Sequence, residues 1–197
     1  MTPLRWPTLL EPEQQPLLAK ALLEYVLPRR WFRAKGRTIR GAGIADLVPL
    51  DPDNILAILR IDYASGDPDL YAVPLAMLDG PPVPALGDRG ADGIPAIVAP
   101  LGKDGLEGAI IDGLQVPGHA AEALLDRMRS GRPARGEMNG QVRSEALPPM
   151  VDLGGVELPT ARLPRVEQTN STAVFGDRVL LKIYRQLTSG ANPELWL

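Results

Sequence analysis

Lys182 is the residue whose surroundings most suggest chemistry. It lies in a short apolar run with high strand propensity. Side chains of a strand alternate between two faces, which places Leu180, Lys182 and Tyr184 on one face and Val179, Leu181 and Ile183 on the other. A lysine on an edge strand can cover apolar surface with its stem and discourage edge pairing. Alternatively, a rigid strand can present the ammonium to nucleotide phosphates, as a kinase fold requires. The strand alone leaves both interpretations open.

A polar turn lies ahead of the strand that pairs with this one in the predicted hairpin. Its residues are Glu167, Gln168, Thr169, Asn170, Ser171 and Thr172. Hydroxyl and amide groups occupy the turn where a protein kinase carries glycines above the phosphates, so the glycine-based motif is absent. The turn is a candidate phosphate-covering loop because Lys182 would lie beneath it.

The composition excludes several other kinds of site. The chain has no cysteine, so disulfides and thiolate metal sites are excluded. With one histidine, His119, there is no His-based zinc site and no catalytic triad that avoids this residue. We expect His119 to be exposed in the first turn of a helix. The net charge of −3 gives no bulk electrostatic reason to expect nucleic acid or an anionic membrane as partner.

A basic segment at residues 29–37 surrounds Trp31 and Phe32 with five cations: Arg29, Arg30, Arg33, Lys35 and Arg37. Such a cluster could bind phosphate or nucleic acid. The acidic balance of the rest of the chain favours a structural interpretation. In that interpretation the two aromatic rings anchor the segment under a sheet, and the arginines stack outside.

Six aspartates of the first half of the chain lie mostly at expected strand ends and turns: Asp46, Asp51, Asp53, Asp62, Asp67 and Asp69. Aspartate often binds nearby backbone groups at such positions. We therefore interpret them as turn formers and not as a metal cluster.

Periodicity and turn residues predict the elements up to residue 112. Apolar residues at helical spacing, ended by Pro28, predict an amphipathic helix over 11–26: Leu17, Leu18, Ala21, Leu22 and Tyr25. Strand-like runs follow at 43–50, 54–63, 70–78, 95–101 and 106–112. The second and third of these form a hairpin through the loop 65–68, and residues 79–93 form a Pro- and Gly-rich loop.

The remaining chain is predicted to change from helix to short strands. A second helix spans 118–130, with Leu124, Leu125 and Met128 inward and Gly131 as its stop. Residues 131–136 are a predicted linker, followed by strands at 137–147, 155–168, 172–176 and 179–185. Gly176-Asp177 indicates a tight hairpin between the last two. The predicted fold class is α+β, a mixed sheet with helices followed by an antiparallel sheet.

The chain lacks the features of an export signal or membrane anchor. No basic stretch precedes an apolar segment at the N-terminus, and no apolar run approaches membrane-spanning length. We therefore expect a cytoplasmic location.

Three stretches of the chain resemble one family. EQTNST, VFGDRVLLKIYRQL and NPEL, all within residues 165–197, are similar to the segment that opens the kinase lobe of bacterial maltokinases, including those fused to trehalose synthase. PRRWFRAKGRTI resembles a signature of their N-terminal cap, and LRIDYASGDPDLYAVPLAML resembles the cap hairpin that follows. The three matches occur in the family's order and span most of the chain from about residue 20.

This resemblance implies a cap domain over residues 1–130 and part of a kinase N-lobe over 131–197, akin to aminoglycoside phosphotransferases and protein kinases. It implies ATP-dependent phosphorylation of maltose at its anomeric hydroxyl, with Mg²⁺, in α-glucan, glycogen or trehalose metabolism. A related branch resembles the chain but phosphorylates glucosamine. Lys182 matches the lysine that binds nucleotide phosphates, and the turn Gln168, Thr169, Asn170, Ser171 and Thr172 matches the phosphate-covering hairpin.

Two departures limit what the resemblance implies. The family often shows a second carboxylate two residues after the glutamate of NPEL, where this chain has Trp196. Glu194 is therefore either the partner of Lys182 or a favourable charge in a first helical turn. The catalytic aspartate and metal ligands belong to a later lobe, so we expect no catalytic residue within these 197 residues and no activity from them alone.

Two classes of function follow. The first is the N-terminal part of a sugar kinase, with ATP and maltose as partners and trehalose synthase as a candidate docking partner. The second is a non-catalytic binding or assembly module. An incomplete lobe would leave sheet edge and apolar surface uncovered, so we also expect a homodimer through the 165–185 region.

Overall fold

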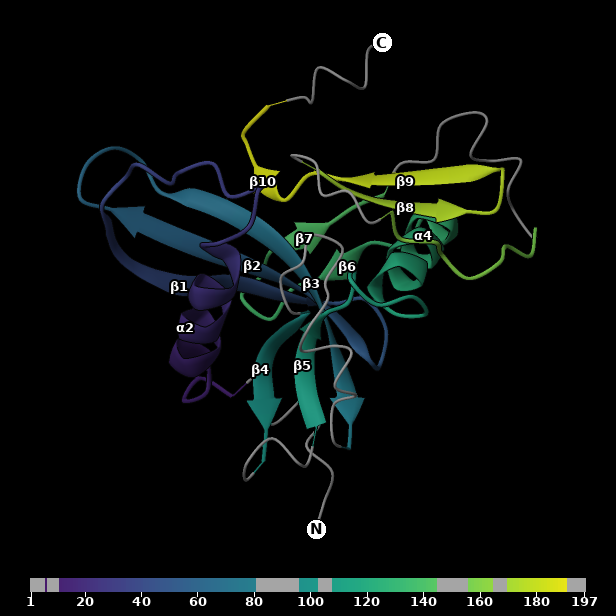
Figure 1. Cartoon of the computed structure of the whole chain (residues 1–197), viewed down its shortest axis with the longest axis horizontal. Coiled ribbons are helices and arrows are strands. Elements are labelled where there is room, and N and C mark those ends of the chain that lie inside the picture. The colour runs from purple at the N-terminus through teal and green to yellow at the C-terminus, as the bar shows by residue number, and fades with distance from the viewer. Residues whose placement is uncertain are drawn as a thin grey trace.

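A computed structural model describes residues 6, 11–80, 96–102, 108–144, 156–164 and 170–190. The fold is α+β, as the sequence predicted, and is built on a curled antiparallel sheet of six strands (Figure 1), called the main sheet below. The strand order is β1-β2-β3-β5-β4, and β10 also pairs with β3. The strands are β1 (Ile39–Pro49), β2 (Asn54–Tyr63), β3 (Asp69–Asp79), β4 (Ile97–Leu101), β5 (Gly108–Asp112) and β10 (Gln186–Leu187).

The β2–β3 hairpin is the predicted one, and its loop has the expected turn chemistry. Gly66 adopts a φ of +80°, a conformation that glycine allows without a side-chain clash. The Arg37 guanidinium closes the loop by donating to the carbonyls of Ser65 (3.0 Å) and Asp67 (2.8 Å). The predicted loop at 79–93 falls almost entirely outside the described residues.

Helix α2 (Gln15–Val26) packs on the main sheet, mainly across β1 and β4. The sequence predicted a helix over 11–26, and the observed helix starts four residues later. Its inward residues are Leu18, Ala19, Leu22, Tyr25 and Val26. Leu17, expected on the apolar stripe, is 65% exposed because this stripe is centred one residue further along the chain.

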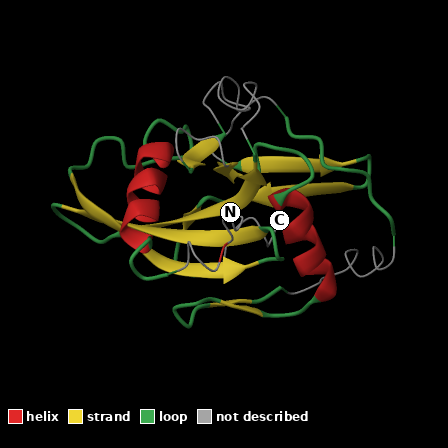
Figure 2. Ribbon diagram, turned by 90° about the horizontal axis from the view of Figure 1, so that it is seen from below, coloured by secondary structure: helices red, strands yellow, loops and turns green. Residues whose placement is uncertain are grey.

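Helix α4 (Ala120–Ser130) lies between two apolar clusters. Ala123 packs with main-sheet residues that include Val48 and Leu56, whereas Ala121 and Leu125 pack with a separate C-terminal hairpin. Figure 2 shows α2 and α4 at opposite ends of the sheet. Gly131 ends α4 in the left-handed conformation, with a φ of +62°, as predicted.

Two predictions about α4 were wrong in detail. Met128, expected inward, is 38% exposed because Leu125 and the alanines already fill the contact with both neighbours. His119 is half-buried at the position before the first helical residue and is not an exposed residue within the first turn.

Residues 131–136 are not a simple linker. Strand β6 (Ala134–Arg135) lies there and pairs with β7 (Gln141–Val142), so residues 137–140 of the predicted strand at 137–147 form the turn of a small hairpin. This hairpin lies against β1, where the backbone N–H of Glu137 donates to the carbonyl of Leu47 at 3.0 Å. Of the predicted strand at 155–168, the structure describes residues 156–164, and within these it forms an isolated bridge from Arg162 to Val174.

Asp46 fixes the β6–β7 hairpin and is not a turn former. Its buried carboxylate accepts hydrogen bonds from the backbone N–H of Leu47 (2.8 Å) and of Met138 (3.0 Å). A Cβ atom at Gly136 or Gly140 would collide with this carboxylate. Only glycine therefore fits at the two ends of the turn that encloses Asp46.

We predict that Gly140→Ala lowers the free energy of unfolding by about 1–3 kcal/mol, the usual cost of overpacking a buried contact. Urea unfolding followed by circular dichroism measures the change. Gly36→Ala is the matched control, since a Cβ atom there meets nothing within 4 Å. Equal unfolding midpoints for the two variants would contradict this account of the turn.

Candidate functional site

The candidate site is the hairpin of β8 (Ser171–Phe175) and β9 (Val179–Ile183), the separate C-terminal hairpin that packs on α4. The two strands pair antiparallel with Thr172 opposite Lys182. Gly176 takes a φ of +60° in the connecting turn, in agreement with the hairpin predicted from Gly176-Asp177. The hairpin on which the nucleotide interpretation depends is therefore formed.

The two faces of β9 differ as the alternation predicted. Leu181 is buried against α4 together with Ala173 and Phe175 of β8. On the opposite face, Lys182 is exposed and Leu180 is 64% exposed. The Lys182 ammonium lies 5.0 Å from the centre of the Tyr184 ring, which is a cation–π distance. Packing against α4 thus fixes one face of the hairpin and leaves the lysine face accessible.

The structure describes four of the seven predicted nucleotide-site residues: Asn170, Ser171, Thr172 and Lys182. It brings Thr172 and Lys182 together as cross-strand partners. Ser171 stands opposite Ile183, on the face away from Lys182, and its hydroxyl accepts a hydrogen bond from Arg185 Nε at 2.8 Å, so the structure does not bring it together with the lysine. Gln168, Thr169 and Glu194 lie outside the described residues, so the pairing of Glu194 with Lys182 stays a prediction.

Arg185 is a residue that sequence reasoning missed. Its guanidinium is fully buried and pairs with the equally buried Asp112 at the end of β5, with 2.6 Å between Nη2 and Oδ2. The same Asp112 oxygen accepts from the Tyr25 hydroxyl at 2.9 Å, and the other oxygen accepts from the backbone N–H of Leu114 at 3.0 Å. The guanidinium carbon also lies 5.0 Å from the centre of the Trp31 ring.

A sequence signal for this ion pair existed but was incomplete. Asp112 ends the apolar run Gly108–Asp112, and Arg185 stands three residues after Lys182 in the stretch KIYRQ. Charged residues at the end of a buried strand are rarely fully buried unless paired. Either residue would need a partner if it were buried, but the sequence indicated neither the burial nor the partner, which lies 73 positions away.

Burial raises the pKa of Tyr25 well above its ordinary value, and the nearby Asp112 carboxylate raises it further. The phenol therefore stays protonated and donates to Asp112. Tyr63 and Tyr71 also have raised pKa values, with burial as the main cause.

The basic segment at 29–37 is largely structural. Trp31 and Phe32 are buried and lie against the Tyr71 ring, with centroid distances of 6.0 and 5.4 Å. This confirms the predicted aromatic anchor. The expectation that the arginines lie outside is wrong for Arg29, which is fully buried and stacks 3.8 Å from the centre of the Tyr25 ring. Arg37 stacks on Tyr63 at 3.5 Å.

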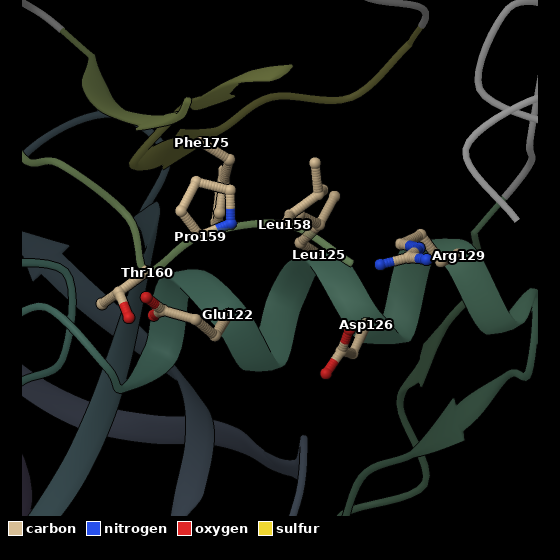
Figure 3. Close-up of a pocket in the computed structure, with 8 residues that line it drawn as sticks. All are labelled: Glu122, Leu125, Asp126, Arg129, Leu158, Pro159, Thr160 and Phe175. Atoms are coloured by element: carbon tan, nitrogen blue, oxygen red, sulfur yellow. The ribbon is translucent and has the colours of Figure 1, made fainter. Parts of the chain in front are cut away.

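A pocket of about 160 Å³ lies between α4 and residues 158–160 (Figure 3). Glu122 Oε1 accepts from the backbone N–H of Ala161 at 2.8 Å and of Gly118 at 3.1 Å. In Figure 3 the Glu122 carboxylate points toward Thr160, whereas Asp126 points away from this segment. The pocket is lined by none of the predicted nucleotide residues. The pocket marks the contact between α4 and the segment that leads to β8, which Glu122 fixes through its hydrogen bond from Ala161.

Two kinds of feature are not found within the described ranges. Among those residues no group of three or more carboxylate or imidazole side chains could hold a metal ion. In the same part of the chain, no helix has the length and apolar character needed to cross a membrane.

We predict that these three tyrosines contribute their full share of stability below about pH 10, the ordinary tyrosine pKa, and that this contribution is lost at higher pH. A raised pKa in the folded state means that the unfolded chain loses its phenolic protons first, which favours unfolding as the pH rises. Tyr25→Phe should reduce this alkaline fall without abolishing it. Urea midpoints between pH 8 and 11 measure the effect. Parallel profiles for the two proteins would contradict the assignment.

Residues 25–115 match the model of a known family, the maltokinase N-terminal cap domain. The matched range begins at Tyr25, includes the buried aromatic anchor and ends three residues after Asp112. It therefore covers most of the main sheet and stops before α4 and the β8–β9 hairpin.

Proposed function

We propose that this chain is the N-terminal part of an ATP-dependent sugar kinase, because its residues 25–115 match the maltokinase N-terminal cap domain. The reaction would transfer the γ-phosphoryl group of ATP to the anomeric hydroxyl of maltose, giving maltose 1-phosphate and ADP. The proposal places the reaction in α-glucan, glycogen or trehalose metabolism, with a trehalose synthase as a candidate docking partner.

One observation carries the proposal. The cap is followed in the chain by a hairpin whose accessible face bears Lys182, while its opposite face is fixed on α4. A kinase requires a cation on a rigid strand next to the nucleotide phosphates. The edge-lysine interpretation explains the exposure of Lys182 equally well, but it gives no reason for this hairpin to accompany a maltokinase cap.

Lys182 and the turn before β8 would bind the nucleotide. The ammonium would neutralise phosphate oxygens, and Thr172, on the same face as Lys182, would donate a hydrogen bond to them from its hydroxyl, together with the side chains of Gln168, Thr169 and Asn170. Bound Mg²⁺ would supply further charge neutralisation, with ligands from a catalytic lobe. Positioning by these residues alone does not transfer a phosphoryl group, because it supplies no catalytic base.

We predict that Lys182→Ala, in the complete gene product that contains this chain, lowers kcat/KM for ATP by about 100-fold, the scale of removing one electrostatic contact to the transition state. A coupled assay of ADP release measures it. Lys20→Ala is the matched control, since Lys20 is exposed on α2, a helix whose main contacts are with β1, β4 and β2. Full activity of Lys182→Ala would contradict the site assignment.

The sugar acceptor needs a separate experiment. Maltose and glucosamine are compared side by side as acceptors for the same gene product, with phosphorylated sugar detected directly. We expect maltose to be the better substrate, in accordance with the matched cap family. Preferential phosphorylation of glucosamine would keep the kinase proposal and replace its substrate.

A further inference from the structure

We infer that Arg185 is a positioning residue that couples the cap to the nucleotide lysine. Through the buried pair with Asp112, it fixes where β9 presents Lys182. This inference rests on the proposed function, because it assumes that Lys182 binds ATP.

The first argument is the place of the ion pair along β3. Strand β10 pairs with Tyr71 and Leu70 at the start of β3, and β5 pairs with the later residues Leu75–Asp79 on the main sheet. The backbone N–H of Ala72 donates to the Arg185 carbonyl at 2.7 Å, and Asp112 stands opposite Leu75. Arg185 and Asp112 thus meet where the end of β5 approaches the start of β10.

The second argument is the path of the chain between the two sheets. Lys182 lies in β9 of the hairpin, and only Ile183 and Tyr184 separate it from Arg185, whose backbone already bonds to β3. The side chain of Arg185 also reaches back to the hairpin, where Nε donates to the Ser171 hydroxyl opposite Ile183. One guanidinium therefore joins the first residue of β8, the end of β5 and the ring of Trp31.

The third argument is the stiffness of this connection. Both charged side chains are completely buried, so a shift that separated them would leave unpaired charges away from water. The Tyr25 hydroxyl and the backbone N–H of Leu114 hold the Asp112 carboxylate from two further directions. The position of the strand that carries Lys182 is consequently set by residues of the matched cap domain.

The test uses the complete gene product and two substitutions in a double-mutant cycle. Asp112→Asn keeps the size of the side chain but removes its charge, and Lys182→Ala removes the proposed phosphate contact. The dissociation constant of Mg-ATP is measured by titration calorimetry for both single variants and the double variant. KM for the sugar is measured in parallel as a readout that should not move.

We expect Asp112→Asn to weaken Mg-ATP binding by about 5- to 10-fold, the lower range of typical coupling between sites. It should have no further effect when Lys182 is already alanine, because residues that act as a unit are not additive. Arg37→Met is the matched control. Arg37 also stacks on an aromatic ring and pairs with an aspartate, but these partners lie within the cap.

Each other result has a definite meaning. If Asp112→Asn weakens Mg-ATP binding equally in both backgrounds, its effect does not pass through Lys182 and the inference is overturned. If Lys182→Ala weakens binding and folded Asp112→Asn does not, the inference fails while the proposed function stands. If Lys182→Ala binds normally, both fail.

If the Asp112→Asn variant does not fold, Tyr25→Phe replaces it in the Mg-ATP binding test. It removes one hydrogen bond to Asp112 and keeps the ring on which Arg29 stacks. We expect Tyr25→Phe to weaken Mg-ATP binding by less than Asp112→Asn would, with an unchanged KM for the sugar. Parent-like Mg-ATP affinity in folded Tyr25→Phe would then overturn the inference.

Discussion

The buried ion pair between Arg185 and Asp112 constrains how the two parts of this chain fit together. Removing water from two charges is costly, and loss of either partner would cost about 3–5 kcal/mol because the other charge would stay buried. Tyr25, Ser171 and the backbone N–H of Leu114 supply the hydrogen bonds that make the pair tolerable. The connection from the C-terminal hairpin to the main sheet runs through the point where these groups meet.

The division predicted at residue 130 separates segments that share their packing in the structure. Helix α4, on one side of it, forms an apolar cluster with β8 and β9 on the other. The β6–β7 hairpin encloses Asp46 of β1, and β10 adds to the edge of β3. The match to the cap family ends at residue 115. The elements that follow residue 115 nevertheless pack against the matched part of the chain and against one another. In the proposed kinase, a cap linked in this way would influence the nucleotide site without touching the nucleotide.

Local patterns predicted most of the elements because their causes lie within a few residues. The β2–β3 hairpin follows from two apolar strands around a Gly-Asp-Pro turn, and Gly131 ends α4 through its own left-handed conformation. Alternation correctly placed Leu181 and Lys182 on opposite faces of β9, of which the structure buries the first and exposes the second. Errors arose at helix faces, as for Leu17 and Met128, where a neighbouring surface decides which residues are covered.

The sequence by itself determined the fold class, the hairpin that carries Lys182 and the aromatic anchor at Trp31 and Phe32. Only the tertiary structure decided that two charged residues, Asp46 and Arg185, are buried. Aspartate and arginine are residue types that usually lie at the surface. Asp46 is buried because Met138, 92 positions away, donates a hydrogen bond to it, and Arg185 is buried because Asp112, 73 positions away, accepts one from it. Local propensity carries no information about such partners, since burial of a charge depends on groups that meet only after the chain has folded.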